Sequence, residues 1–348
     1  MRRNTHIGLA TASILLLSVT TIAQQAKSKA EYDAYKTMYD EQDQQQKSRL
    51  AEAFLDEFSD SDFTPATFQL LANSYVGLRN WRKVVETAEK FDQYVPDANT
   101  IVKGFMYQRA MAAAEQSRDN TKVVEFGEKV LEVDRNNLGA LLTLSTVITD
   151  NLPEDESNRQ ASLSRVFQLA NRARIQAAQA LRNKPQTFSD DQWAAQRAAV
   201  FTRIHMTLGV IHYNRGSYEK AVDEYKTVLQ YNPRDPFAYL QLGLSYEYQA
   251  AGKSTLVVAA VDAENDARES QVDLQTVEEM VAEREGLEEE ILSGIDLAID
   301  SLAKAVALGG EAGNLARVEL EKLYLQKNKD SLEGLEELIE EKRLELNQ

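Results

Sequence analysis

Apolar side chains recur at spacings of three and four residues along almost the whole chain, and no long alternating run of β-branched residues interrupts them. Such spacing places side chains on one face of an α-helix, whereas a half-buried β-strand alternates with a period of two. Glycine and proline, which interrupt helices, number only 15 and 6 among the 348 residues. The pattern therefore predicts an all-α fold.

The clearest internal organisation lies in residues 202–235, TRIHMTLGVIHYNRGSYEKAVDEYKTVLQYNPRD. Gly209 and Ala221 are small where two helices would cross closely, and Gly216 permits a backbone reversal between them. Pro233 then ends the second helix. This arrangement resembles the tetratricopeptide repeat, a 34-residue pair of antiparallel helices. The resemblance implies a right-handed α-solenoid in which successive helix pairs stack on one another.

Further helix pairs keep the same register with weaker agreement, so that the pattern covers about residues 63–310. At Thr64-Pro65 and Asp235-Pro236 we expect an N-cap residue followed by proline at the first helical position. Residues 104–137 give another pair. The pair that begins with LGALLTLSTVIT is delayed by the polar loop DNLPEDESNRQ.

We divide the chain into three parts. They are a signal peptide or anchor (1–23), an N-terminal helical segment (24–62) and a solenoid (63–348). The solenoid should end in two capping helices, the last of which would start at a capping box made by Asp330 and Glu333.

The N-terminus predicts export. MRRNTH carries two arginines, and IGLATASILLLSVTTIA follows without a charge, which is the order of a secretory signal peptide. We expect cleavage after Ala23. The alternative is an uncleaved anchor in the inner membrane, formed by residues 7–23, whose 17 residues are at the short limit for a span. Either way the arginines stay in the cytoplasm, so the body of the protein would be periplasmic or secreted.

A second resemblance supports a bacterial envelope setting. The segment FLDEFSDSDF at the end of residues 24–62 is similar to a feature of envelope tetratricopeptide proteins, some of which help to assemble outer-membrane proteins. Those proteins are lipoproteins, whereas this chain has no cysteine and cannot carry that lipid anchor.

An insertion at about residues 253–294 separates the two helices of the pair that begins at Asp235. It starts with Gly252-Lys253-Ser254-Thr255, the tail of a phosphate-loop signature, but position 247 is a glutamate where that loop needs glycine. We therefore interpret residues 252–255 as a turn at a helix end.

Between Asp262 and Glu290 the insertion holds twelve acidic residues and two arginines, a net charge of −10. We interpret it as an elongated solvated helix that runs into residues 291–308, with a mobile loop at 251–265. The alternative is an arm that recruits a basic partner or loosely collects cations. The spacing of a calcium loop is absent.

Charge and composition exclude several classes of partner and of catalytic group. A formal net charge of −16 opposes binding to nucleic acid and to anionic membranes, which leaves a membrane contact only through an uncleaved N-terminus. Without cysteine, neither disulfides nor a thiol nucleophile can form. His205 and His212 lie seven residues apart, at repeat positions that usually pack between helices, and we expect packing rather than metal binding. We predict no catalytic residue, no metal, no nucleotide and no other cofactor.

Tetratricopeptide arrays bind partners on a concave face lined by the first helix of each pair. In this register that face would contain Asn73, Gln108, Arg203, Met206, Val210, Tyr213, Asn214, Leu240, Leu244, Glu247 and Tyr248. Tyrosines with a few polar groups suit an extended peptide or a helix. The sequence thus predicts an exported, non-enzymatic scaffold for a protein or peptide, basic or neutral. The alternative is an envelope assembly factor or carrier that holds unfolded or lipidated clients.

Overall fold

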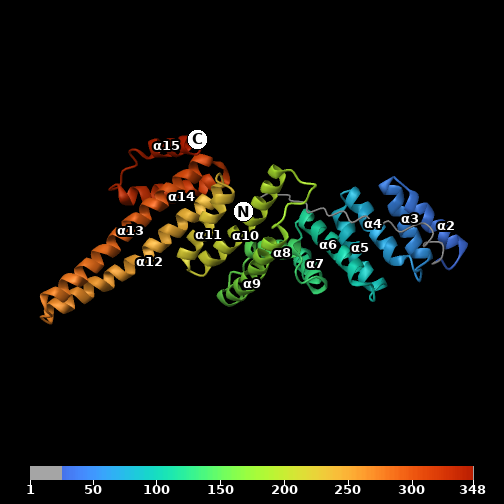
Figure 1. Ribbon diagram of the computed structural model, residues 1–348, viewed down its shortest axis with the longest axis horizontal. Helices are drawn as coiled ribbons and strands as arrows, with labels where there is room; N and C mark the ends of the chain where they lie inside the picture. Colours follow the sequence, from blue (N-terminus) through green and yellow to red (C-terminus); the bar gives the residue numbers. More distant parts are fainter. Residues whose placement is uncertain (1–25, 348) are drawn as a thin grey trace. The chain divides into compact units, whose positions relative to one another are not determined.

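The computed structural model describes residues 26–347, and within that range every regular element is an α-helix (Figure 1). The predicted all-α class and the solenoid of antiparallel helix pairs are confirmed. The predicted signal peptide (1–23) and the alternative anchor (7–23) lie outside the described residues. Among the helices that are described, none is long and apolar enough to cross a membrane.

The chain divides into two compact units, residues 1–176 and 177–348. The helices that begin in the first unit are α2 (Lys29–Asp40), α3 (Gln44–Glu57), α4 (Thr64–Gly77), α5 (Trp81–Tyr94), α6 (Thr100–Ser117), α7 (Asn120–Val133), α8 (Leu138–Asp150) and α9 (Glu156–Ala180). From α2 to α8 each helix contacts the next. They share one apolar core, in which Phe54, Phe68 and Phe91 are almost completely buried.

Helices α2, α3 and α5 to α8 each begin at a polar N-cap whose side chain accepts a hydrogen bond from a backbone N–H three residues on: Ser28, Asp43, Asn80, Asn99, Asp119 and Asn137. The prediction that Thr64 caps α4 is wrong. Thr64 already lies inside the helix, and Phe63 occupies the N-cap without a side-chain hydrogen bond. Phe63 is buried and stacks on Tyr35 with ring centroids 4.4 Å apart, so packing sets where this helix begins.

The second unit contains α10 (Asp190–Asn214), α11 (Tyr218–Tyr231), α12 (Pro236–Glu269), α13 (Leu274–Leu308), α14 (Gly310–Lys327) and α15 (Leu335–Glu345). The predicted repeat at 202–235 forms the end of α10 and all of α11. Gly209 packs against the buried ring of Tyr225, and a Cβ there would lie 2.5 Å from the ring. Gly216 adopts φ +68° in the turn, as its place in the repeat predicts.

The insertion forms an arm, defined here as residues 250–269 of α12 and 274–294 of α13, which projects as an antiparallel two-helix hairpin (Figure 1). The predicted helix running into 291–308 is present. The interpretation of residues 252–255 as a turn is wrong, and so is the loop expected at 251–265, because α12 is helical without interruption to Glu269. The Ser254 hydroxyl donates to the carbonyl of Ala250 inside the helix instead of capping a new one.

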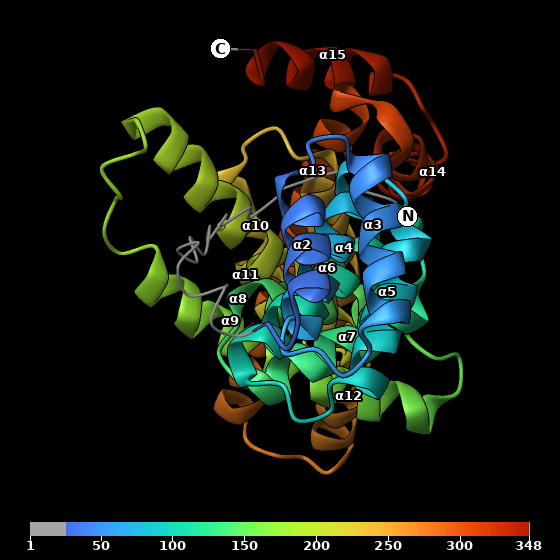
Figure 2. The same cartoon turned by 90° about the vertical axis from the view of Figure 1, so that its right-hand side faces the viewer.

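Two helices end the chain, as predicted, and α15 packs against α13 (Figure 2). The expected capping box of Asp330 and Glu333 does not form. The last helix begins only at Leu335, after Gly334 at φ +87°, while Asp330 itself has a positive φ of 65° in the preceding turn. Asp330 lies five residues before the first helical residue, which is too far for its side chain to cap the first turn.

Candidate functional site

The residues predicted to bind a partner lie on α10 and α12 of the second unit, and three tyrosines join these helices to α11. The ring of Tyr213 on α10 meets the ring of Tyr248 on α12 edge-on, with centroids 5.6 Å apart. Tyr218, the first residue of α11, stacks on Tyr248 at 5.3 Å. Tyr213, Tyr218 and Tyr248 form a continuous aromatic group, which we call the tyrosine cluster.

Within the tyrosine cluster, the surroundings of Tyr213 keep its hydroxyl group protonated. Burial of Tyr213, together with the neighbouring Tyr248 hydroxyl and the Glu247 carboxylate, raises the pKa of Tyr213 well above its usual range. The hydroxyl therefore stays neutral at physiological pH and can both donate and accept a hydrogen bond. Tyr248 is 46% exposed, so one edge of the cluster is open to solvent.

Apolar neighbours extend this surface along both helices. Met206 and Val210 on α10 and Leu244 on α12 are half-buried and pack against the apolar core of the second unit. Leu240, also predicted for the site, is only 3% exposed and belongs to that core, so it contributes packing and no accessible surface. Val210 and Leu244 thus form a partly accessible apolar strip beside the tyrosines.

Two other residues of α10, Asn214 and Arg203, were also predicted to bind a partner. The Asn214 amide donates a hydrogen bond to the carbonyl of Val210 within its own helix. Arg203 is half-buried near the middle of α10. Asn214 therefore helps to end the helix that carries Tyr213, and its amide nitrogen is already used.

Helix α14 adds residues that the sequence analysis missed. The ammonium of Lys322 donates to the carboxylate of Glu247 at 2.9 Å, which links α14 to α12. Leu315 and Val318 precede Lys322 by seven and four residues and so lie on the same side of α14. They are 47% and 66% exposed. The signal in the sequence was this stripe on a helix whose opposite face, with Ala312, Ala316 and Leu320, is buried.

We name this surface the α10–α12–α14 face. Its residues are Val210, Tyr213, Leu244, Glu247, Tyr248, Leu315, Val318 and Lys322. The face combines aromatic rings, aliphatic side chains and one ion pair, in which Lys322 is exposed and Glu247 is largely buried. It can hold a partner by apolar contact and a few hydrogen bonds, which is the composition of protein-binding surfaces.

The predicted residues of the first unit lie elsewhere. Asn73 on α4 and Gln108 on α6 are both exposed, and their two helices contact each other. They belong to residues 1–176, whereas the α10–α12–α14 face belongs to residues 177–348. The structure thus brings together the predicted residues of α10 and α12 within the second unit, and the helices of Asn73 and Gln108 within the first.

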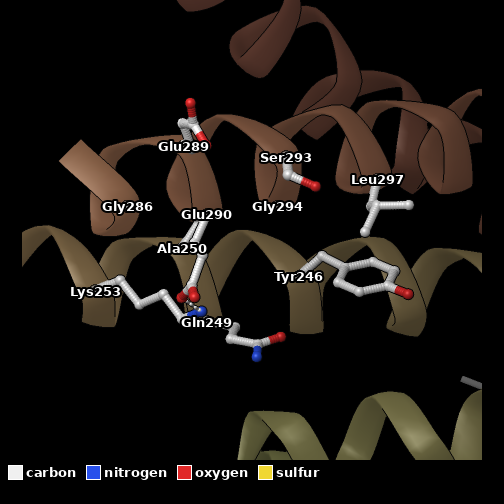
Figure 3. A pocket seen from close by; sticks show the side chains of 10 residues that line it. All are labelled: Tyr246, Gln249, Ala250, Lys253, Gly286, Glu289, Glu290, Ser293, Gly294 and Leu297. Atoms are coloured by element: carbon white, nitrogen blue, oxygen red, sulfur yellow. Dashed lines mark hydrogen bonds and ion pairs between the residues drawn. The ribbon is translucent and has the colours of Figure 1, made fainter. Parts of the chain in front are cut away.

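A groove of about 640 Å³ lies at the base of the arm, between α12 and α13 (Figure 3). Its lining residues are Tyr246, Gln249, Ala250, Lys253, Gly286, Glu289, Glu290, Ser293, Gly294 and Leu297. Lys253 and Glu290 form an ion pair across it. A Cβ on Gly294 would lie 3.2 Å from that of Ala250, so the two backbones approach closely here. Lys253 is the one cation among the lining residues and is paired with Glu290, while Glu289 leaves the groove with a net negative charge.

His205 packs between helices, as its position in the repeat predicts. His205 Nδ1 lies 2.6 Å from a carboxylate oxygen of Glu224, and its ring stacks near those of Phe201 and Tyr231. Among residues 26–347 no group of three histidine, aspartate or glutamate side chains is placed to hold a metal ion.

Comparisons with known proteins bear on the second unit in particular. Residues 209–249 match the family model described as TPR repeat, the abbreviation for tetratricopeptide repeat. No curated protein matches the chain. The matched residues run from Gly209 of α10 through α11 and into α12, and they include Tyr213, Glu247 and Tyr248.

Similar solved structures include two bacterial proteins. A tetratricopeptide repeat protein from Parabacteroides merdae is 12% identical, with 85% of this chain and 99% of that chain covered and a TM-score of 0.38. A TPR repeats protein from Bacteroides fragilis is 14% identical, with 75% and 96% covered and a TM-score of 0.30.

A human protein is also similar, the IFIT1 dimer with m7Gppp-AAAA, at 15% identity, 93% and 71% coverage and a TM-score of 0.33. The family match falls on the helix pair in which the sequence pattern was clearest. By this match residues 209–249 belong to a tetratricopeptide repeat.

Proposed function

We propose that this protein is an exported, non-enzymatic scaffold that binds an extended peptide or a helix of a partner protein on the α10–α12–α14 face. The observation that carries the proposal is the set of exposed apolar and aromatic side chains on α12 and α14, two helices that the Glu247–Lys322 contact joins. Tyr248, Leu315 and Val318 are each between 46% and 66% exposed. Large exposed apolar groups that adjoin one another favour a binding surface.

The polar groups of the face indicate which kind of partner fits. The Tyr213 hydroxyl can donate to a peptide carbonyl, and Glu247 can accept from a peptide N–H or from a basic side chain. The Glu247–Lys322 pair is exposed on its lysine side, and such surface pairs hold only weakly, so a partner can replace either member. The acidic charge of the whole chain favours a basic or neutral partner over an acidic one.

The N-terminal sequence supports the exported location, since two arginines precede 17 uncharged residues. N-terminal sequencing of the protein purified from its exporting cell tests this part separately. A chain that begins at Gln24 supports export with cleavage after Ala23. A chain that retains Met1 and stays with the membrane supports the anchor of residues 7–23, and one that retains Met1 in the cytoplasm refutes export.

The binding surface can be tested by photo-crosslinking from chosen positions. The photoreactive residue p-benzoylphenylalanine replaces Tyr248 or Val318, and in a control it replaces Ile175, which is 54% exposed on α9. Envelope extract is irradiated with each variant. One protein crosslinked from both Tyr248 and Val318, and not from Ile175, supports the proposal.

Two other outcomes would count against the scaffold. Equal crosslinking from all three positions would show that the contact has no preference for the α10–α12–α14 face. Many different proteins crosslinked from Tyr248 and Val318 would favour the alternative function, a carrier of unfolded clients, because a carrier contacts many chains through the same apolar surface.

A further inference from the structure

The ion pair between Glu247 and Lys322 belongs to a group of three residues whose charges do not balance. The ammonium of Lys322 lies 2.9 Å from a carboxylate oxygen of Glu247 and 3.2 Å from one of Glu319 on its own helix α14. Two carboxylates therefore share one ammonium. The Lys322 side chain is 53% exposed, whereas that of Glu247 is only 16% exposed. The group has one negative charge in excess, and its more buried carboxylate is paired with an exposed lysine.

This sharing allows another cation to replace Lys322 at Glu247. An exposed ion pair contributes little to stability, so its loss has a small free-energy cost. When a second cation binds Glu247, Lys322 keeps its contact with Glu319, and no charge is left without a partner. A guanidinium can form two parallel hydrogen bonds with a carboxylate, which an ammonium cannot. Glu247 thus suits a guanidinium that a partner protein brings.

The tyrosine cluster supplies a second set of groups for the same cation. Burial is the largest cause that raises the pKa of Tyr213, and a hydrogen bond with Tyr248 and the negative charge of Glu247 add to it. The Tyr213 hydroxyl therefore lies close to both, and its oxygen can accept a hydrogen bond from a guanidinium N–H. The ring of Tyr248 is 46% exposed. An exposed tyrosine ring attracts a cation, and the planar guanidinium can stack on it.

The geometry of α12 leaves room for the side chain that carries this cation. Glu247 and Tyr248 are consecutive residues, so their side chains leave the helix about 100° apart. Leu244, three residues before Glu247, and Ala251, three residues after Tyr248, point in directions between these two. Ala251 is exposed and has only a methyl group, and Leu244 is half-buried. A side chain between the carboxylate and the ring therefore rests on aliphatic surface, which suits the methylene groups of arginine.

From this arrangement we propose that the α10–α12–α14 face selects its partner segment by an arginine, whose guanidinium pairs with Glu247 and stacks on Tyr248. This inference rests on the proposed function, because it names the anchor residue of the segment that the face binds. A lysine brings the charge without the planar fork, and a neutral or acidic residue leaves the excess carboxylate unbalanced. The net charge of −16 on the whole chain also favours a cation.

Pools of short peptides test the anchor without knowledge of the partner. Each pool contains fluorescein-labelled peptides whose central residue is fixed and whose other positions are random among uncharged residues. The central residue is arginine in the probe and lysine, citrulline or glutamate in the three controls, of which citrulline has the shape of arginine without its charge. Fluorescence measures the peptide that the immobilised chain 24–348 retains at physiological ionic strength. We expect at least tenfold more retention of the arginine pool than of the citrulline pool, because hydrogen bonds between charged groups contribute about that factor.

Single variants locate the anchor at Glu247. E247Q should reduce retention of the arginine pool to the level of the citrulline pool, whereas E278Q, which removes the same charge from an exposed position of α13, should change it less than about twofold. K322Q should raise retention about two- to fivefold, because the lysine no longer competes for Glu247. K327Q, which breaks an exposed ion pair with Asp296, is the matched control for that gain. Circular dichroism at 222 nm checks that each variant keeps its helices.

The outcomes separate this inference from the proposed function. If the arginine and citrulline pools are retained equally and L315Q/V318Q reduces both, the face binds peptides without an arginine anchor, so the inference fails while the proposed function stands. Equal losses in E247Q and E278Q would show that the acidity of the chain attracts arginine without a site. Equal retention of the lysine pool would refute the stacked guanidinium. Retention of no pool would contradict the inference and the proposed function together.

Discussion

The substitution G209A tests the packing of the repeat on which the fold assignment rests. Gly209 lies in α10 where the helix crosses α11, and a Cβ there would lie 2.5 Å from Cε1 and 2.8 Å from Cζ of Tyr225. Real Cβ atoms do not approach carbon atoms so closely, so the ring or the helix must move. Tyr225 is fully buried, which leaves its ring no free space to rotate into.

The expected magnitude is a difference between two effects. Overpacking a well-filled core costs about 1–3 kcal/mol. Alanine is also a better helix former than glycine by about 1 kcal/mol, which opposes that cost. Because the clash is with a rigid buried ring, the upper part of the range applies, and the net loss should be about 2 kcal/mol. For a unit of this size that lowers Tm by about 4–8 °C.

Thermal unfolding followed by circular dichroism on the chain 24–348 measures this loss, and G252A supplies the matched control. Gly252 also lies inside a helix, but nothing stands within 4 Å of the position that an added methyl group would take. G252A should therefore show the helix-forming gain alone, a stabilisation of up to about 1 kcal/mol. G252A also tests the structure of the arm, because alanine raises the free energy of unfolding at position 252 only if that residue is helical.

A stricter test than G209A alone is to remove the Tyr225 ring with which the new methyl group would clash. Replacing Tyr225 with leucine removes the ring that obstructs the new methyl group, although Y225L is itself destabilising. In the Y225L background G209A should cost much less than in the unmodified chain, a coupling that a double-mutant cycle isolates. If G209A stabilises the protein as G252A does, α10 and α11 do not cross at Gly209, and the reasoning fails.

Two further predictions concern the end of the chain and the turn of the repeat. Burial opposes the ionisation of Asp300, but hydrogen bonds from Lys342 and Lys304 hold the pKa of Asp300 below its usual range. A lowered folded pKa gives stability that is full above the unfolded value of about 4 and is lost as pH falls through the folded value. Hydrogen exchange of α15, corrected for intrinsic rates, should thus be constant from about pH 8 to 5 and accelerate below about pH 4. D300N should weaken this dependence without abolishing it, because Lys304 and Lys342 also lower the pKa of Glu345 on α15. G216A should destabilise by about 1 kcal/mol in a urea titration, because φ is +68° and the space around the site is open, whereas G216N should cost less.

Much of the fold follows from residues whose physical role is local. Gly209, Gly216 and Pro236 specify a close crossing, a reversal and a helix start, and the structure shows each of them in the second unit. Positions that depend on tertiary contacts were predicted less well. Thr64 has the chemistry of an N-cap, but Phe63 and its stacking partner Tyr35 determine where α4 begins.

The arm shows why the sequence analysis failed at residues 251–265. The segment has glycine, lysine, serine and threonine in a row, which is the composition of a turn, and its larger apolar residues, Leu256, Val258 and Val261, do not share one helix face. Its helix is supported by α13, through small side chains that allow close approach and through the Glu264–Arg284 pair. Those contacts join residues 20 or more positions apart, so a local pattern could not reveal them.

The candidate site was predictable to a similar extent. Tyr213, Glu247 and Tyr248 were found because they occupy known positions of the repeat pattern. Leu315, Val318 and Lys322 were missed because α14 lies beyond the region in which that pattern was recognisable. They became part of the site only when the contact between Lys322 and Glu247 placed α14 beside α12.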